Sequence, residues 1–400
     1  MSEPRASAGP KPAVARAESP ESRPSESKTR VAAQRAAAAR PRGRPDAMHR
    51  AQLLAWAPVL FQAAWVLRER GLLRELIARV AQGASVDELA TATDTSPYGV
   101  TVLLEAGLAT DLVVQQEGRF RPTALAYLVE RDPMTRANMN FVQDVCYRAM
   151  GHLGEAIASG KPAGLAELGP WSTVYAGLAE LGEPARTSWL EFDHFYSDDS
   201  FPLVLPQVFS SRPARVLDVG GNTGKFALAC LGYDPDVRIT VADLPGQLES
   251  CRREVEQAGD GRRVSYHPVD LLALDAALPA GHDVIWMSQF LCCFSEVEVV
   301  HILRLARSVM GPATRLLIMD NFWDRQQTRA AEVVLQAASL YFTCVANGNS
   351  RLYDSGTLRR CVERAGLEIV DERHGVGLGH SLLECRGAPG AATGAAPGGR

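Results

Sequence analysis

The stretch VLDVGGNTGKF, from Val216 to Phe226, decides the fold of this chain. Its apolar beginning, VLDV, is typical of a buried strand, and Gly220, Gly221 and Gly224 follow it as a tight turn. The next residues, KFALA, are typical of the start of a helix. A strand, a glycine turn and a helix N-terminus together indicate a site for a nucleotide-type ligand.

From Arg215 onwards, apolar strand-like segments alternate with helix-like segments. The candidate strands are RVLDVGG, RITVADLP, VSYHPVDLL, DVIWMSQ, RLLIMDN and LEIVDERH. Helical stretches separate them, notably SEVEVVHILRLARSVM and SGTLRRCVERAG. This alternation predicts an α/β domain with a mainly parallel sheet that is covered by helices on both faces.

The segment before this domain has the order helix, turn, helix, hairpin, which is a winged-helix pattern. Ser85 is a predicted N-cap with Glu88 three residues later, a second helix starts near Pro97, and a hairpin turns at Glu117-Gly118. The would-be recognition helix, PYGVTVLLEAGLATD, has no Lys or Arg, so we expect no nucleic-acid partner. Its apolar surface suits packing against a second copy of the chain.

Composition limits the remaining possibilities. The chain has 400 residues, 46% of them hydrophobic, and a net charge of −4, which is enough for two domains and gives no general basicity. No apolar run of ~18 residues predicts a membrane span. The eight cysteines form no CxxC pair, so we expect reduced thiols in the cytoplasm.

The predicted organisation is a disordered tail (1–47), a helical winged-helix-like dimerisation domain (48–185), an α/β domain (186–386) and a second disordered tail (387–400).

Three kinds of glycine loop compete for the turn after the first strand. A P-loop needs GxxxxGK[ST], but Phe226 follows Gly224-Lys225, and Val219 stands where the first glycine belongs. A dinucleotide fingerprint needs GxGxxG, and Asn222 and Lys225 occupy its second and third glycine positions. The pattern that remains is acid-x-Gly-x-Asn-x-Gly, from Asp218 to Gly224.

This pattern resembles motif I of the class I S-adenosylmethionine-dependent methyltransferases, usually (E/D)xGxGxG, which have a Rossmann-like fold. Close backbone approach at Gly220 and Gly221 makes room for the amino acid tail of S-adenosylmethionine. Asp243, just past the second strand, can accept both ribose hydroxyls, and Asp270, after the third strand, is placed for the adenine amine. The predicted cofactor-binding residues are Asp218, Gly220, Gly221, Asn222, Gly224, Asp243, Leu244, Asp270, Leu271, Ser288 and Gln289.

The resemblance extends over roughly Leu53 to Cys385. The winged-helix region, VLDVGGNTGKF, VADLP and YDSGTLRRCVERAGLEIV are similar to the plant-caffeate and bacterial small-molecule O-methyltransferase family. The stretch FLCCFSEVE is similar to that of methyltransferases from aryl-polyene pigment pathways. This resemblance implies a homodimer that methylates a phenolic or other aromatic small molecule, or an acyl intermediate, of secondary metabolism.

The catalytic position departs from the family pattern, because Cys292 stands where the family has its histidine and Cys293 replaces the following Asp. Three explanations are open: His194 is the base, no strong base is needed because the methyl group goes to a ring carbon ortho to a phenol, or Cys292 itself is the base or a nucleophile. Whether oxygen or carbon is methylated stays open. A catalytically lapsed cofactor- or partner-binding protein is the alternative function. The predicted acceptor-side residues are Tyr147, Trp171, Tyr196 and Trp323.

A metal route is the remaining alternative for activating the acceptor. Asp320-Asn321 ends a strand as in magnesium-dependent catechol methyltransferases, but Ser288-Gln289 provides no further acid. We therefore predict no metal site.

Overall fold

The computed structural model describes residues 45–259 and 261–388, which form two compact units divided between Ala126 and Tyr127. The division differs from the predicted boundary at residue 185. Residues 127–185 join the second unit because side chains such as Phe141 and Val174 share a core with Tyr341 and Cys344, late in the chain. The predicted tails, 1–47 and 387–400, lie outside the described residues except for 45–47 and 387–388.

The first unit has the predicted order of helix, turn, helix and hairpin. Its elements are α2 (Pro45–Glu69), α3 (Leu72–Ala78), α4 (Val86–Thr93), α5 (Pro97–Ala109), β1 (Val113–Gln116) and β2 (Arg119–Pro122). The predicted capping box is present, since the Ser85 hydroxyl accepts the Glu88 N–H and the Glu88 carboxylate accepts the Ser85 N–H. Glu117 and Gly118 both have positive φ, as a two-residue hairpin turn requires.

The second unit is built on a seven-stranded sheet. Its strands are β3 (Arg215–Val219), β4 (Arg238–Asp243), β5 (Val264–Pro268), β6 (Val284–Ser288), β7 (Arg315–Asp320), β8 (Leu367–Val376) and β9 (His380–Gly387). Their order is β5-β4-β3-β6-β7-β9-β8, with β3 to β7 parallel and the last two antiparallel. The six predicted strands are confirmed, and β9 was not predicted. Because the chain order reverses beside β3, the carboxyl end of β3 is the expected ligand position.

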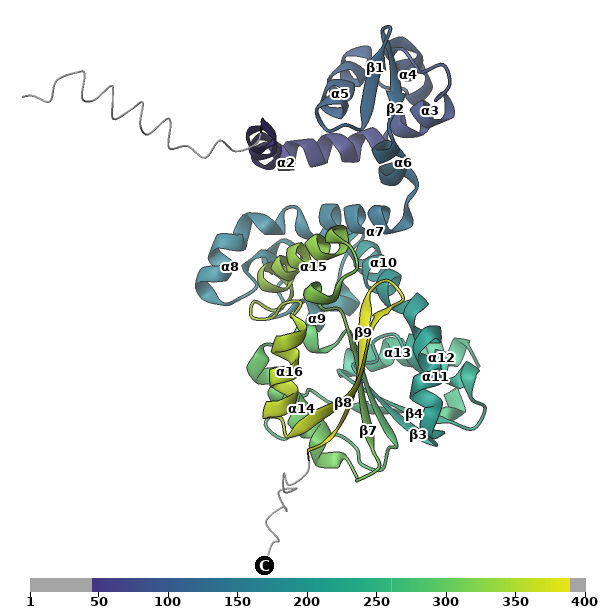
Figure 1. Cartoon of the computed structure of the whole chain (residues 1–400), viewed down its shortest axis with the longest axis vertical. Helices are drawn as coiled ribbons and strands as arrows, with labels where there is room; N and C mark the ends of the chain where they lie inside the picture. Colours follow the sequence, from purple (N-terminus) through teal and green to yellow (C-terminus); the bar gives the residue numbers. More distant parts are fainter. Residues whose placement is uncertain (1–44, 260, 389–400) are drawn as a thin grey trace, which may run out of the picture. The chain divides into compact units, whose positions relative to one another are not determined.

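Strand residues alternate between two cores, one on each face of the sheet. Leu217 and Val219 belong to the core under α14 (Glu296–Val309) and α16 (Ser355–Arg364). Val216 and Trp286 belong to the opposite core. That core is covered by α11 (Phe201–Val208), α12 (Lys225–Tyr233) and α13 (Pro245–Gln257). Figure 1 shows these two helical layers on either side of the sheet.

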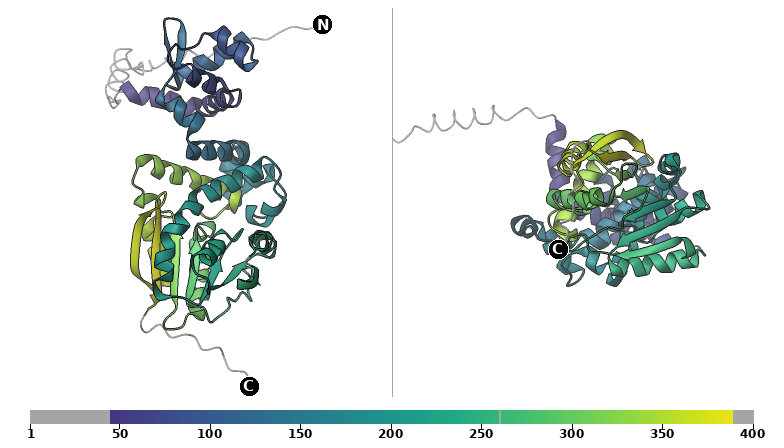
Figure 2. Two further views of the ribbon diagram at one scale, coloured as in Figure 1. Left: turned by 90° about the vertical axis from the view of Figure 1, so that its right-hand side faces the viewer. Right: turned by 90° about the horizontal axis from the view of Figure 1, so that it is seen from below.

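A third group of helices lies beyond the carboxyl ends of the parallel strands. It comprises α7 (Pro133–Phe141), α8 (Leu153–Ser159), α9 (Val174–Gly177), α10 (Ala185–Ser197) and α15 (Arg329–Tyr341), and it follows α6 (Ala124–Arg131). Both views show α7 and α15 together at this end (Figures 1 and 2). Trp189 donates its indole N–H to the Tyr341 hydroxyl at 2.7 Å, which ties α10 to α15.

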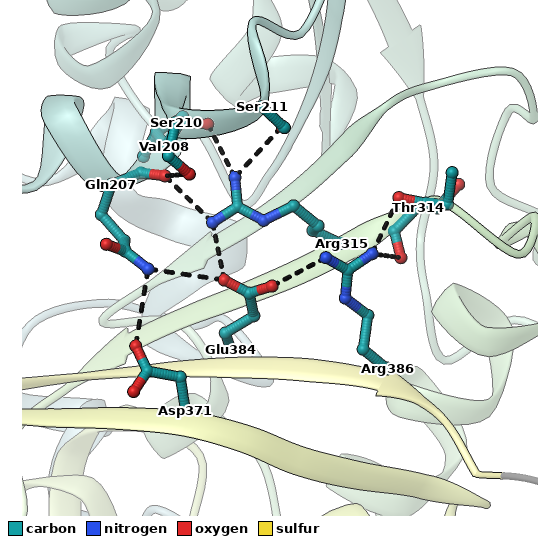
Figure 3. Close-up of polar contacts among 10 residues, drawn as sticks. Gln207, Val208, Ser210, Ser211, Thr314, Arg315, Asp371, Glu384 and Arg386 are labelled. Atoms are coloured by element: carbon teal, nitrogen blue, oxygen red, sulfur yellow. Dashed lines mark hydrogen bonds and ion pairs between the residues drawn. The ribbon is translucent and has the colours of Figure 1, made fainter.

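A buried ion pair fixes the unpredicted strand β9 to the sheet. The Arg315 guanidinium donates to Glu384 Oε2 at 2.6 Å and to the backbone oxygens of Gln207 and Val208 (Figure 3). Arg386 donates to the other oxygen of Glu384 at 2.9 Å. The network therefore joins β7, β9 and the end of α11.

Across residues 45–259 and 261–388, no helix has both the length and the apolar character needed to cross a bilayer.

Candidate active site

Gly220 and Gly221, in the turn after β3, have no room for a side chain. Gly220 has a φ of +75°, and a Cβ there would overlap the Phe290 ring. A Cβ on Gly221 would lie 2.6 Å from a methyl carbon of Val241. The bare backbone at both positions is a cradle that a ligand can approach closely.

Asp243, at the end of β4, holds the turn in place. Its carboxylate accepts the backbone N–H of Asn222 at 2.9 Å and that of Leu244 at 2.7 Å. Burial raises the pKa of Asp243 to about 6, against the lowering effect of these two bonds. Asn222 has a φ of +48°, and its amide donates to Asp193 Oδ2 at 3.1 Å. The turn thus connects Asp243 with a carboxylate of α10.

Asp218, near the end of β3, is buried. Its Oδ2 has no hydrogen-bond partner among the described residues, and neither has the buried Ser288 hydroxyl. Burial, and then the charge of Asp243, raises the pKa of Asp218 to about 8. Unpaired buried polar atoms are unfavourable unless a ligand satisfies them. Together with the glycine cradle, they fit a polar, positively charged ligand such as S-adenosylmethionine.

A cavity of about 560 Å³ opens beside this turn, within the second unit. All the predicted cofactor residues line it except Gly224. Gly224 has a φ of +81° and precedes α12, and a Cβ there would lie 2.7 Å from Cys251 Sγ. Gly224 therefore shapes the turn and its packing on α13, and we no longer place it against the cofactor.

The acceptor side of the cavity differs from the predicted set. His194, Tyr196 and Cys292 line it, whereas Tyr147, Trp171 and Trp323 do not, so we no longer place those three at the acceptor. Trp171 folds over its own loop, where it covers Gly169 and Gly177 and donates its indole N–H to Glu180 at 3.3 Å. Residues that sequence reasoning missed complete the wall. They include Tyr175, Trp189, Phe192, Asp193, Phe290, Tyr341, Phe342 and Asn347.

These missed residues carried no recognisable sequence signal, because they come from elements that meet only in the fold. Tyr175, on α9, is an example. Its buried hydroxyl has no hydrogen-bond partner in the described part of the chain. Asn347 donates its amide to the Cys293 carbonyl at 2.5 Å and so holds the cysteine segment from the side of α15. Asp193 is the exception, because it directly precedes His194, which the sequence did indicate as a candidate base.

The two cysteines lie on a short 3₁₀ turn, Leu291–Cys293, just after β6. Cys292 is buried, and its thiol approaches the Gln289 carbonyl oxygen at 3.5 Å. The hydrogen bond with Cys293, then burial and the charge of Asp320, raises the pKa of Cys292 well above its usual range. Cys292 is therefore a neutral thiol at physiological pH and a poor base.

His194 lines the cavity and is paired with Asp198 on the same segment. Its Nδ1 lies 3.3 Å from Asp198 Oδ1, and Lys225 Nζ lies 3.9 Å from the other oxygen of Asp198. The hydrogen bond with Asp198 raises the pKa of His194. A histidine with a raised pKa is protonated over a wider pH range, so a smaller share of it is free to accept a proton at a given pH.

Asp320 ends β7 beneath the cysteine turn. Burial raises its pKa to about 7, and its Oδ1 accepts the Asn321 N–H at 2.8 Å. In the described part of the chain, no three His, Cys, Asp or Glu side chains gather as they would around a metal ion.

Comparison with known proteins agrees with this geometry. Residues 48–120 match the model of a Dimerisation2-like domain, and residues 203–367 match that of an O-methyltransferase domain. A 3-amino-4-hydroxybenzoate 4-O-methyltransferase of Streptomyces cremeus is 26% identical over 315 residues, covering 77% of this chain and 82% of the relative. Aclacinomycin 10-hydroxylase RdmB of Streptomyces purpurascens is also 26% identical, over 77% of this chain and 82% of the relative.

Among solved structures, the S-adenosylmethionine-dependent methyltransferase SibL in its apo form superposes with a TM-score of 0.64. It is 25% identical, and the match covers 84% of this chain and 98% of SibL. Both domain models and the cofactor cradle lead to one assignment. The chain belongs to the family of S-adenosylmethionine-dependent O-methyltransferases that carry an N-terminal dimerisation domain.

Proposed function

We propose that this methyltransferase methylates the hydroxyl oxygen of a phenolic small molecule of secondary metabolism. The observation that carries the proposal is a single cavity that joins the cofactor cradle to an aromatic wall. Phe192, Phe290, Tyr341 and Phe342 contribute rings to that wall, which suits a flat aromatic acceptor. The relative from Streptomyces cremeus is named for a hydroxylated aromatic acid, which supports the same acceptor class.

The cofactor half of the cavity provides the groups that S-adenosylmethionine needs. When bound, the cofactor supplies an electrophilic methyl group on a positively charged sulfur. Asp218 offers an unpaired carboxylate oxygen for a cationic or N–H group, and Asp243 offers a carboxylate for hydroxyls. Gly220 and Gly221 allow the backbone to approach the ligand closely. These residues bind and orient, and perform no bond-breaking chemistry themselves.

The acceptor half orients the phenol and excludes water. Tyr175 has a buried hydroxyl with no partner in the described residues, so it can bond a polar substituent of the acceptor. Cys292 is a neutral thiol, and both cysteine side chains are nearly apolar, so they suit packing against a ring. Fixing the acceptor oxygen in line with the transferred methyl group contributes much of the rate enhancement.

The assembly we propose is a homodimer joined through the first unit. Three large apolar side chains of α2, those of Leu54, Trp56 and Val59, are each more than half exposed in the single chain. Such a patch is typical of an interface, and the Dimerisation2-like match covers the same helix. All eight cysteines are free thiols, which suits the reducing cytoplasm.

Incubation with methyl-labelled cofactor and a panel of hydroxylated aromatic acids and their amides tests the function. We expect label on a phenol oxygen, located by mass spectrometry of the product. Label on a ring carbon would show instead that the enzyme methylates carbon. A hydroxylated product without the label would place this enzyme with the hydroxylase among its relatives. No finding supports the alternative of a lapsed enzyme, which would label no acceptor.

A further inference from the structure

We propose that Asp193 is the catalytic base of this enzyme, in place of the family histidine whose position Cys292 occupies. The inference rests on the proposed methylation of a phenol oxygen. It goes beyond that function by identifying where the phenol proton goes, which neither His194 nor Cys292 explains well.

The helix α10 presents Asp193 and His194 to different surroundings. Successive residues of an α-helix point about 100° apart. His194 makes its contact with Asp198, farther along the same helix, whereas Asp193 makes its contact with Asn222 on the cofactor turn. Both line the cavity, and Asp193 is the one of the two that bonds directly to a residue of the glycine turn. Asp193 therefore lies where cofactor and acceptor meet.

The carboxylate is held by one oxygen and available at the other. Asn222 donates to Asp193 Oδ2 at 3.1 Å, and no hydrogen bond from a described residue reaches Oδ1. A fixed carboxylate with an available oxygen is the arrangement that a general base requires. The bond from Asn222 stabilises the orientation without neutralising the charge.

The charged and titratable groups around Asp193 raise its pKa on balance. Burial and the charge of Asp198 raise the pKa of Asp193, whereas His194 and the Asn222 bond lower it. The charge of Asp193 in turn contributes to the raised pKa values of Cys292 and Tyr341, so both groups lie within its electrostatic reach. A carboxylate with a raised pKa takes up a proton more readily than an exposed one.

The competing carboxylate is Asp320, which also lines the cavity. It already accepts the Asn321 N–H at 2.8 Å and further hydrogen bonds from Cys292. Its role is thus to hold the cysteine turn on the end of β7. Asp193 has fewer internal partners and is the more available of the two.

The proposed step balances as follows. The acceptor O–H bond breaks and its proton passes to Asp193 Oδ1, which becomes a carboxylic acid. The electron pair of the oxygen forms the new bond to the methyl carbon, and the pair of the broken carbon–sulfur bond stays on sulfur. Asp193 then loses its proton to solvent.

The test compares the pH dependence of kcat in four variants with that of the wild type. Asp193→Asn should lower kcat by about 10²–10⁴-fold and remove the fall in kcat at acidic pH, because that fall reports protonation of the base. Asp193→Glu should retain the acidic fall with a smaller loss. Asn222→Gly removes the same hydrogen bond but leaves the carboxylate, so it should also retain the acidic fall. Asp199→Asn, exposed in the same segment, is the matched control and should behave as wild type.

The affinity for S-adenosylhomocysteine, measured by calorimetry, separates a base from a structural residue. We expect Asp193→Asn to change it by less than tenfold while kcat falls much further. An Asp193→Asn enzyme with near wild-type kcat, or with its acidic fall intact, would overturn the inference while the proposed function stands. A wild-type enzyme that methylates no phenol would overturn the proposed function, and the inference with it.

Discussion

Replacing Asp218 by asparagine should stabilise the ligand-free enzyme, and the gain should grow as the pH rises. In the folded protein the pKa of Asp218 is about 8, because it is buried and faces the charge of Asp243. In the unfolded chain an aspartate has a pKa of about 3.9. Between these two values the folded state keeps a proton that the unfolded state has released. Unfolding therefore becomes easier with each step up in pH, until the pH passes about 8.

The size of the effect follows from the same pKa difference. Each pH unit within this window lowers the free energy of unfolding by at most about 1.4 kcal/mol. From about pH 5 to about pH 8, the ceiling for Asp218 is about 4 kcal/mol. Relaxation around a buried charge reduces such values, so we expect about 2–4 kcal/mol. The Asp218→Asn variant has no carboxyl group to titrate at this position, so its free energy of unfolding should fall less over the same pH range.

Urea unfolding at fixed protein concentration, followed by tryptophan fluorescence, would measure the effect. Trp286 is fully buried and stacks on Phe226 with ring centroids 4.2 Å apart, so it reports on the core next to Asp218. Asp199→Asn is the control for a charge removed from the surface. Saturating S-adenosylhomocysteine should flatten the wild-type curve, because its cationic amino group favours the ionised carboxylate. Parallel pH curves for wild type and Asp218→Asn would refute the reasoning.

Three further predictions concern the cofactor, the sheet and the assembly. Asp243→Ala should weaken S-adenosylhomocysteine binding by on the order of 1.5–3 kcal/mol in calorimetry, and unchanged affinity would remove Asp243 from the site. Arg315→Met leaves the buried Glu384 without its closest cation and should lower the free energy of unfolding by about 3–5 kcal/mol. A loss below 1 kcal/mol would show that the network is dispensable. Sedimentation should give a mass near twice 43.2 kDa, and a monomer at micromolar concentration would contradict the dimer.

The parallel part of the sheet was predictable because its central strands β3, β6 and β7 are buried on both faces and are therefore mostly apolar. Strand β9, HSLLECRG, was not predicted, and it carries Glu384 and Arg386 among its apolar residues. Glu384 is tolerated in a buried strand only because Arg315 reaches it from β7, and a partner so distant in sequence cannot be read from the strand itself. The same limit applies to the unit boundary, since the partners of residues 127–185 lie near residue 341.

The two halves of the site differed in how far the sequence predicted them. Cofactor residues follow the carboxyl ends of strands, so their position in space follows from a local rule of parallel sheets. Acceptor residues come from α9, α10 and α15 and from the loops between them, and which helix faces point inward depends on packing. Trp171 was expected in the acceptor wall and instead covers Gly169 and Gly177. Asp193 was passed over for its neighbour His194 because the orientation of α10 was unknown.

Two departures from the family pattern meet at Asp193. Asn222 replaces the usual middle glycine of motif I, and Cys292 replaces the histidine. A glycine at position 222 would have no side-chain amide to donate, so the bond to Asp193 exists only because of the first departure. The second departure puts a neutral thiol, that of Cys292, at the histidine position, so Asp193 has no competing base there. Together the two changes are consistent with moving the base from the end of β6 to α10, with the sheet and the cofactor cradle unaltered.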